Sequence, residues 1–319
     1  MRTITIIAGP TAVGKTKYAI EAAKALNGEI VSCDSMQLYK YMDIGSAKPT
    51  SEERAQVKHY LVDLIDPALP FSVAQYQRMA KDAINEIFAK GKIPIISGGT
   101  GLYVNSLIYD MDFGGGNIDY KLRSDLLKQA EDEGTEELYN RLTQLDPEAA
   151  QRIHPNNTKK LIRALEGAIS GQKIKNFKNC TQKCKDYEIN FIILTRNRDE
   201  LYDRINRRVD LLVEMGLFEE VESLLSHGLT ENDISMKGIG YKEVIACLNG
   251  NYSKDEAIEL IKKNTRHFAK RQITWFKRYE EATWFNISDY KNDDEALGEL
   301  IIWLKSKYKF TAKATNRTI

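Results

Sequence analysis

The segment Ile4–Thr16, with the sequence ITIIAGPTAVGKT, decides the fold. Its first residues, Ile4–Ala8, form an apolar run that predicts a buried strand, and a helix is expected over Lys15–Leu26. Between them, Gly9–Thr16 matches the phosphate-binding pattern G-x4-G-K-[ST] in the strand–turn–helix context that this pattern requires. The sequence therefore predicts a phosphate-binding loop (P-loop) and a bound di- or triphosphate.

Each part of this loop has a chemical role. Its glycines permit tight turns, so that successive N–H groups and the positive end of the helix can surround phosphate oxygens. Lys15 adds a positive charge, and the hydroxyl of Thr16 is a candidate ligand for Mg²⁺. The predicted phosphate-binding residues are Gly9, Pro10, Thr11, Ala12, Val13, Gly14, Lys15 and Thr16.

Strands and helices are expected to alternate along most of the chain. Further apolar runs predict strands at Glu29–Cys33, Ile93–Ser97 and Asn190–Thr195, and Arg78–Ala89 is expected to be a helix. This alternation is typical of a parallel sheet covered by helices on both faces. We therefore expect an α/β fold with a P-loop core.

The stretch between the third and fourth predicted strands is too long for a simple crossover, and its patterns are helical. Asp146 and Asn157 are expected caps of two of its helices. The expected helices are Tyr120–Glu133, Thr135–Gln144, Pro147–Ile153 and Thr158–Ile169. We expect an inserted all-helical domain at residues 114–186, a discontinuous core at 1–113 and 187–310, and a flexible tail at 311–319.

Composition excludes several classes of protein. Of the 319 residues, 42% are apolar, and 46 Lys and Arg against 45 Asp and Glu leave a net charge of +1. No apolar run approaches the roughly 20 residues of a membrane span, and an expected strand stands where a signal peptide would be. Cys180 and Cys184 have no second pair nearby that would complete a zinc site. A cytoplasmic enzyme with reduced thiols and no membrane partner is expected.

The residues that follow two other strands extend the candidate site. Typical nucleotide hydrolases place a carboxylate at the end of an apolar strand, whereas Ile93–Ser97 runs into Gly98-Gly99-Thr100. Because the carboxyl ends of strands face the ligand crevice in an open α/β sheet, Asp34 and Thr100 should lie near the bound phosphate. Asp34 is suited to act as a general base or to bind Mg²⁺ through water, and capping of a turn is its alternative role.

Positive charge is concentrated in two stretches of this nearly neutral chain. Lys159–Lys185 contains eight cations and one acid, and Lys262–Arg278 contains seven cations and no acid, so each has a net charge of +7. Cationic surfaces of this kind bind nucleic-acid phosphates with release of counterions, and solvated lysine faces are the alternative. In the second stretch, one helical stripe is expected to face the core: Ile261, Phe268, Trp275 and Tyr279.

A third basic segment contains two arginines one helical turn apart, Arg204 and Arg208. Arginine is suited to bidentate contact with pyrophosphate. Ion pairs with Asp203 or Asp210 are the structural alternative for this segment.

Six motifs in a fixed order resemble one family. They are GPTAVGKT (Gly9–Thr16), DSMQLYKYMDIGSAKP (Asp34–Pro49), GGTGLY (Gly98–Tyr103), RIHPN (Arg152–Asn156), KGIGYK (Lys237–Lys242) and KRQITW (Lys270–Trp275). Together they closely resemble the bacterial tRNA dimethylallyltransferases, also called tRNA isopentenyltransferases. The resemblance runs from about Ile4 to Phe285 and is far more specific than the P-loop motif alone.

This resemblance implies a prenyltransferase. Members of the family transfer the dimethylallyl group of dimethylallyl diphosphate to N6 of adenosine 37 in tRNA, beside the anticodon, and release diphosphate with Mg²⁺ present. The P-loop would then hold the diphosphate of the donor, with Thr16 as the Mg²⁺ ligand. Asp34 would accept the N6 proton, and Thr100 and Arg208 would steady the leaving diphosphate. A monomer is expected.

The resemblance also implies a tRNA-binding surface that includes the basic stretches. The target adenosine has to be flipped out of its stack to expose N6. The implied tRNA contacts are Asp34, Ser35, Met36, Gln37, Thr100, Arg123, Lys159, Lys160, Leu161, Ile162, Arg163, Lys237, Gly238, Ile239, Gly240, Tyr241, Lys242, Lys270, Arg271, Gln272 and Lys277.

Three other functions fit parts of this pattern. A P-loop kinase for a small molecule would need no basic insertion, and turnover of ATP would reveal it. An isopentenyltransferase that acts on free adenine nucleotides would not need the two basic stretches. A noncatalytic RNA-binding protein would bind tRNA without changing its mass.

Overall fold

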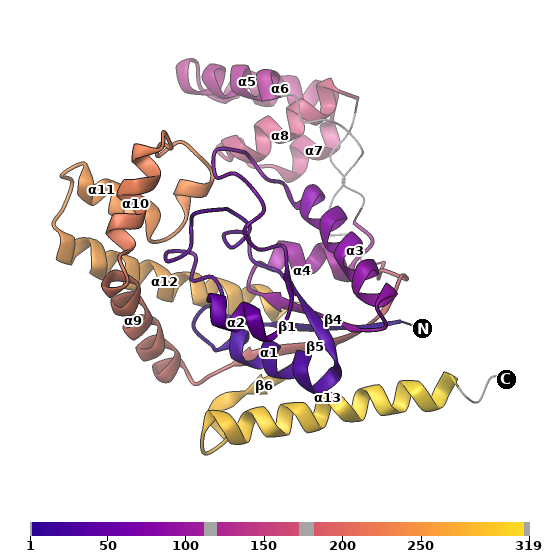
Figure 1. The fold of residues 1–319 in the computed structure, drawn as a ribbon. Coiled ribbons are helices and arrows are strands. Elements are labelled where there is room, and N and C mark those ends of the chain that lie inside the picture. Colours follow the sequence, from indigo (N-terminus) through magenta and orange to yellow (C-terminus); the bar gives the residue numbers. More distant parts are fainter. Residues whose placement is uncertain (1, 112–119, 172–181, 316–319) are drawn as a thin grey trace. The chain divides into compact units, whose positions relative to one another are not determined.

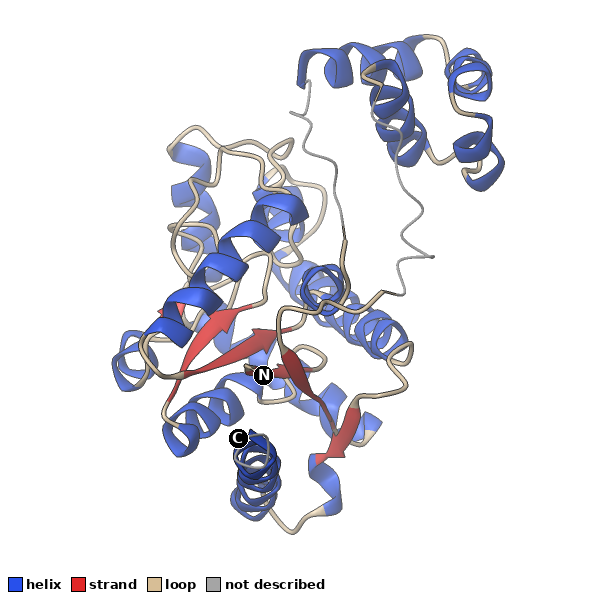
Figure 2. Ribbon diagram, turned by 90° about the vertical axis from the view of Figure 1, so that its right-hand side faces the viewer, coloured by secondary structure: helices blue, strands red, loops and turns tan. Residues whose placement is uncertain are grey.

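The computed structural model describes residues 2–111, 120–171 and 182–315. A six-stranded sheet lies at its centre, every strand pair is parallel, and the strand order is β3-β2-β4-β1-β5-β6. Figure 2 shows these strands as red arrows with helices packed around them. The expected α/β class is confirmed. The strands are β1 (Thr3–Ala8), β2 (Gly28–Ser32), β3 (His59–Tyr60), β4 (Ile93–Gly98), β5 (Glu188–Thr195) and β6 (Thr283–Asn286).

The four predicted strands are present, and the two edge strands were not predicted. β3 has two residues and β6 has four, none of them fully buried, so neither forms the apolar run that marks an inner strand. β1, in contrast, is buried along its whole length. Its register places Ala8 beside Gly98 of β4 and beside Ile193 of β5. The loops that follow these strands therefore start at the same edge of the sheet.

The helices of the same unit surround the sheet (Figure 1). We call this unit, residues 1–109 and 183–319, the core domain. Its helices are α1 (Lys15–Leu26), α2 (Ser51–Gln56), α3 (Val73–Ala89), α4 (Gly101–Ile108), α9 (Arg198–Glu214), α10 (Leu217–Ser226), α11 (Tyr241–Leu248), α12 (Lys254–Phe276) and α13 (Asp293–Thr315), with short 3₁₀ turns at Ser235–Lys237 and Ile287–Asp289.

Two helix bounds differ from expectation. α3 begins five residues before Arg78, because Ser72 and Gln75 form a capping box that starts the helix there. α13 runs beside α1, and the Tyr18 hydroxyl donates to the Asp293 carbonyl at 3.2 Å. Its backbone is helical through Thr315, whereas a flexible tail is expected from residue 311, and residues 316–319 lie outside the described part.

Residues 110–182 form a second compact unit, which we call the helical domain. Leu138, Leu142, Leu161 and Leu165 are buried at its centre. The Asp146 side chain accepts the Ala149 N–H and the Asn157 side chain accepts the Lys160 N–H, so both expected caps are confirmed. Its described helices are α5 (Tyr120–Asp132), α6 (Glu136–Leu145), α7 (Pro147–Arg152) and α8 (Thr158–Ile169). No described helix in either unit has the length and apolar character to cross a bilayer.

Candidate active site

A cavity of about 750 Å³ opens at the carboxyl edge of the sheet in the core domain. Residues that follow three strands line it: the P-loop after β1, Asp34 after β2 and Thr100 after β4. Arg208 of α9 lines the same cavity. The fold thus brings together the three residues for which the resemblance implied catalytic roles, and it places Lys15 beside them.

Gln272 of α12 joins the P-loop to the turn after β4. Its Oε1 accepts the Thr11 N–H at 2.8 Å, and its Nε2 donates to the Gly99 carbonyl at 3.0 Å. A Cβ atom at Gly99 would lie 2.3 Å from this Nε2, which explains the glycine. The Gln272 side chain is largely buried and lines the cavity, so its two hydrogen bonds give it a structural role in addition to the expected tRNA contact.

Two arginines hold the outer side of the P-loop. Arg204 Nε donates to the Ala12 carbonyl and Arg196 Nε donates to the Val13 carbonyl, both at 3.1 Å. The Arg196 side chain is 2% exposed and forms a bidentate ion pair with Asp293 of α13. The backbone of the loop is therefore fixed by side chains 183 and 192 residues away along the chain.

The two arginines singled out on α9 have different environments. Arg204 bonds to the P-loop and lies 3.9 Å from Asp293, so a structural role holds for it. Arg208 lines the cavity, and its Nη2 donates to the Ala47 carbonyl at 3.4 Å. Burial lowers the pKa of Arg208, and the charge of Asp34 opposes this shift. Of the two, only Arg208 is among the residues that line the cavity.

Lys15 is a half-buried cation that lines the cavity. Its Nζ donates to the Pro10 carbonyl at 2.8 Å. Burial lowers the pKa of Lys15 from 10.5 to about 8, the charge of Asp34 opposes this shift, and the charge of Arg208 adds to it. A bound diphosphate would favour the charged amine, as Asp34 does.

The turns after β2 and β4 are packed against each other. A Cβ atom at Gly98 would lie 2.0 Å from the Cys33 carbonyl oxygen, so glycine is required there. The Thr100 Oγ1 accepts the Ser35 N–H at 3.0 Å. Asp34 Oδ1 accepts the Met36 N–H at 2.9 Å, so this carboxylate caps a turn and also lines the cavity. The two roles considered for Asp34 are compatible.

The donor set for a metal ion is small. Among residues 2–111, 120–171 and 182–315, no three His, Cys, Asp or Glu side chains gather as a metal site. Thr16, in the first turn of α1, lines the same cavity as Asp34. Mg²⁺ commonly keeps its waters and binds substrate phosphates with one or two protein ligands. The residues present fit an ion that is carried by a diphosphate.

The core-facing stripe of α12 agrees with the expected one in part. Ile261 and Tyr279 are buried as expected, but Ala269 and Phe276 take the places expected for Phe268 and Trp275. Ala257, Ile261, Ala269, Gln272 and Phe276 are buried, whereas Phe268 is 36% exposed and Trp275 is half-buried. The expected spacings of seven drift around a helix of 3.6 residues per turn, and Tyr279 lies beyond its end. The opposite face exposes Lys263, Lys270, Arg271 and Lys277.

The KGIGYK motif divides between the surface and the core. Five of its residues line the cavity: Lys237, Gly238, Ile239, Gly240 and Lys242, of which the two lysines are exposed. Tyr241 is buried, contrary to its expected tRNA contact, and its hydroxyl donates to Glu220 at 2.8 Å.

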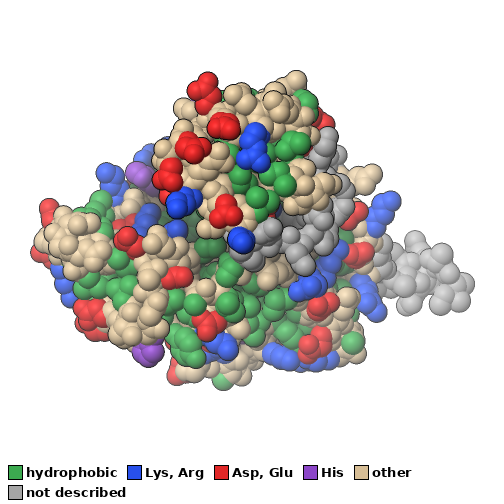
Figure 3. All heavy atoms as spheres, turned by 90° about the horizontal axis from the view of Figure 1, so that it is seen from above, with side chains coloured by type: hydrophobic (Ala, Val, Ile, Leu, Met, Phe, Trp, Pro, Cys, Tyr) green, Lys and Arg blue, Asp and Glu red, His purple; other side chains and the backbone are tan. Residues whose placement is uncertain are grey.

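The expected tRNA contacts of the helical domain include both exposed and buried residues. Lys159, Lys160 and Arg163 of α8 are exposed, whereas Leu161 and Ile162 are buried in the domain core, so their side chains are not available to tRNA. Arg123 forms an ion pair with the buried Glu166, and its side chain remains 31% exposed. Lys173, Lys175 and Lys178 lie outside the described residues. On the face shown in Figure 3, basic and acidic side chains are interspersed.

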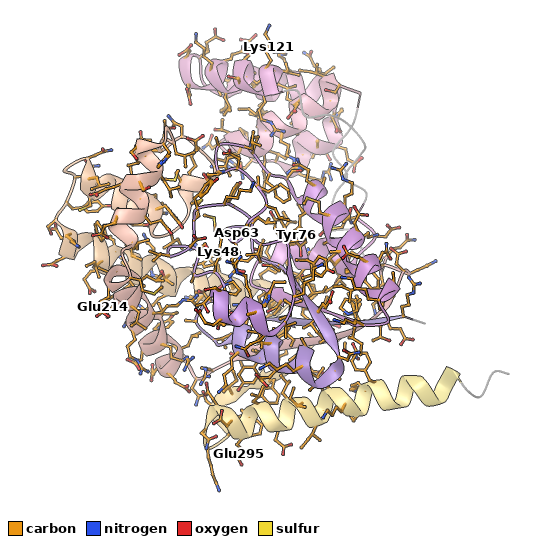
Figure 4. The ribbon with its side chains drawn as sticks, in the orientation of Figure 1. Lys48, Asp63, Tyr76, Lys121, Glu214 and Glu295 are labelled. Atoms are coloured by element: carbon orange, nitrogen blue, oxygen red, sulfur yellow. The ribbon has the colours of Figure 1, made fainter. Side chains whose placement is uncertain are left out.

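Segment 43–50 forms one wall of the cavity. Figure 4 labels Lys48 and Asp63, whose side chains form an ion pair. The Lys48 side chain is 3% exposed and also pairs with Asp43 at 2.6 Å. Only the DSMQLYKYMDIGSAKP motif as a whole marked this segment, because an isolated lysine between two acids gives no signal of burial.

An apolar wall of the cavity was also missed. It is lined by Val209 and Leu212 of α9, by Met215 directly after this helix, and by Ile239 and Phe268. In the sequence such residues cannot be told from ordinary core residues. A cavity with a phosphate-binding end and an apolar wall suits a ligand that has both characters.

Comparison with known proteins identifies the family. The family model described as IPP transferase matches residues 37–279. A tRNA dimethylallyltransferase of Clostridioides difficile (strain 630) is 51% identical over 306 residues, which are 96% of this chain and 98% of the relative. One of Alkaliphilus oremlandii (strain OhILAs) is 52% identical over 300 residues, which are 94% of this chain and 96% of the relative.

Solved structures of similar proteins point to the same family. The full-length tRNA isopentenylpyrophosphate transferase of Bacillus halodurans matches with a TM-score of 0.74 at 42% identity, over 99% of this chain and 100% of the other. A eukaryotic dimethylallyltransferase acting on tRNA matches with a TM-score of 0.84 at 26% identity, over 98% of this chain and 80% of the other. With a family model that matches most of its length and relatives half identical to it, this chain belongs to the IPP transferase family.

Proposed function

We propose that this chain transfers the dimethylallyl group of dimethylallyl diphosphate to N6 of adenosine 37 in tRNA, next to the anticodon. The observation that carries the proposal is the cavity in which a P-loop, the Asp34 carboxylate and an apolar wall meet. Relatives about half identical to this chain carry the name tRNA dimethylallyltransferase, which supports it. The protein would act in the cytoplasm, as a monomer.

The proposed reaction is a substitution at the allylic carbon of the donor. N6 forms a bond to C1, the bond between C1 and the diphosphate oxygen breaks, and its electron pair leaves with the diphosphate. The proton of N6 passes to Asp34. Within the described part of the chain, only one carboxylate oxygen of Asp34 has a hydrogen-bond partner, the Met36 N–H, so the other is available to take this proton.

Cations and N–H groups would stabilise the charge that develops on the leaving diphosphate. The P-loop would surround its oxygens from one side, with Lys15 as the cation, and Arg208 and Thr100 line the same cavity. Mg²⁺ bound to the diphosphate and to the Thr16 hydroxyl would supply further neutralisation of this charge. The apolar side chains of α9 would hold the five-carbon chain, at about 0.8 kcal/mol for each CH₂ group buried.

The proposed tRNA surface consists of exposed cations on both domains. On the core domain these are Lys237, Lys242, Lys270, Arg271 and Lys277. On the helical domain they are Lys159, Lys160 and Arg163. Each would neutralise a backbone phosphate, so affinity for tRNA should depend steeply on salt.

The decisive experiment is mass analysis of tRNA after incubation with the protein, dimethylallyl diphosphate and Mg²⁺. We expect the mass of one dimethylallyl group to be added, at the adenosine beside the anticodon, and diphosphate to be released in equal amount. Unchanged tRNA together with steady hydrolysis of ATP would overturn the proposal in favour of a kinase.

A parallel reaction with AMP in place of tRNA tests the acceptor. Transfer to AMP at the same rate as to tRNA would show that free nucleotides are the substrate. We expect AMP to be a poor acceptor, because the exposed cations of α8 and α12 have no phosphates to bind on it.

A further inference from the structure

The clearest unexplained feature next to the cavity is the environment of Glu220 on α10. Its Oε2 accepts the N–H groups of Asp43 and Ile44 at 2.7 and 2.6 Å. Its Oε1 accepts the Gly45 N–H at 2.9 Å and the Tyr241 hydroxyl at 2.8 Å. Four donors thus meet on one carboxylate that does not itself line the cavity.

Tyr241 makes this arrangement tight. Its side chain is fully buried. A Cβ atom at Gly45 would lie only 2.6 Å from Cζ of the Tyr241 ring. Glycine at position 45 is therefore required for the segment to pass the ring. Glu220 and Tyr241 hold the backbone of residues 43–45 from two sides.

The held segment leads directly to the proposed site. Two residues after Gly45, Ala47 has a φ of +49°, a left-handed conformation that is uncommon outside glycine and has to be held by its surroundings. The Ala47 carbonyl accepts from Gln37 Nε2 at 3.3 Å and from Arg208 Nη2 at 3.4 Å. Both of these side chains line the cavity.

We propose that Glu220 is a positioning residue for the transfer reaction: it fixes segment 43–47 so that the Ala47 carbonyl sets the orientation of Arg208 and Gln37. The proposal rests on the proposed function through the role of Arg208 at the diphosphate. A mutation far from the reacting atoms that displaces such groups by about 1 Å can cost about 10²-fold in rate.

Glu220→Gln is the test variant, because its amide keeps one acceptor but turns an NH₂ group toward backbone N–H donors. We expect the single-turnover rate of transfer, at saturating donor and tRNA, to fall about 10- to 100-fold. The salt dependence of tRNA affinity should stay unchanged, because the exposed cations are untouched. Glu219→Gln is the matched control: Glu219 is exposed, lies in the same first helical turn, and should leave the rate unchanged.

Two further measurements separate positioning from loss of folding. Hydrogen exchange of the Asp43, Ile44 and Gly45 amides should become faster in Glu220→Gln while β1 stays protected. In a double-mutant cycle, Glu220→Gln should add little to the rate loss of Arg208→Ala, since the first acts through the second. Equal rates for Glu220→Gln and Glu219→Gln, or losses that multiply fully in the cycle, would overturn the positioning role. A normal rate for Arg208→Ala alone would instead contradict the proposed site.

Discussion

The cavity wall and the outer face of α12 both carry positive charge, but they hold it in different ways. Lys15 and Arg208 are buried enough for their pKa values to be lowered, and each has a backbone carbonyl as partner. Lys270 and Lys277 are exposed. Charge in the cavity is thus fixed in place for one small ligand, whereas charge on the helix can adapt to a long phosphate backbone. Changes in the first region should affect the chemical step, and changes in the second should affect affinity and its salt dependence.

The largest expected effect is on the chemical step, through Asp34. Asp34→Ala and Asp34→Asn should both lose about 10²–10⁴-fold in turnover, because the group that accepts the proton is removed. The Asn variant keeps an oxygen that can accept the Met36 N–H, so it preserves the turn. Single-turnover kinetics with both variants checks this. Normal turnover by Asp34→Asn would show that Asp34 acts only as a turn cap and not as the base.

The next effect concerns Gln272, which connects the two regions. Gln272→Ala leaves the Thr11 N–H and the Gly99 carbonyl without their partner, and it should cost about 1–3 kcal/mol of unfolding free energy. Affinity for diphosphate should fall, whereas the salt dependence of tRNA binding should not change. Urea unfolding and binding titrations measure both. A changed salt slope with normal diphosphate affinity would contradict the cavity role and support a direct tRNA contact.

A smaller effect is expected from pH, through Lys15. Its folded pKa of about 8 lies below the ordinary 10.5, so the free protein loses this charge as pH rises through 8. Affinity for diphosphate should therefore fall by up to about tenfold per pH unit above pH 8 and should be insensitive to this group below it. The sign is opposite for stability: between pH 8 and 10.5 the unfolded chain binds the extra proton, so the unfolding free energy should rise with pH. Lys15→Met should show neither trend.

The smallest effect at a fixed salt concentration is expected on the outer face of α12. Replacing Lys270 and Lys277 together should reduce the slope of log affinity for tRNA against log salt by about one to two contacts, at 0.7–0.9 per contact. Diphosphate affinity should not change, since neither lysine lines the cavity. Titrations at several salt concentrations check this. Coincident slopes for variant and parent would mean that these lysines are only solvated.

Local patterns could be predicted from the sequence, whereas contacts between distant residues could not. The P-loop, the strands around it and the charge of α12 are local patterns, and each was found in the sequence. The partners that hold the P-loop were not, because Arg196, Arg204 and Gln272 act through single side chains that the fold brings from far along the chain. Burial of Tyr241, Leu161 and Ile162 was missed for a related reason: a motif marks residues that belong together without saying which of them face inward.

Glu220 is the clearest example of this limit. In the sequence it stands next to Glu219 in an ordinary amphipathic helix, with no pattern that separates the two. Only the folded chain shows that one of them accepts four hydrogen bonds and the other is exposed.

The position of β1 in the sheet has a consequence for the order in which the protein can form. β1 is the first strand to be synthesised, yet its two neighbours are β4, at residues 93–98, and β5, at residues 188–195. Nearly 200 residues therefore have to be synthesised before this central strand can pair on both sides. The ion pair between Arg196, which bonds to the P-loop, and Asp293 can form only later still. Folding that depends on such distant contacts is slow, and it leaves apolar strands exposed to aggregation meanwhile. The phosphate-binding loop is thus among the first segments to be synthesised and among the last to be completed.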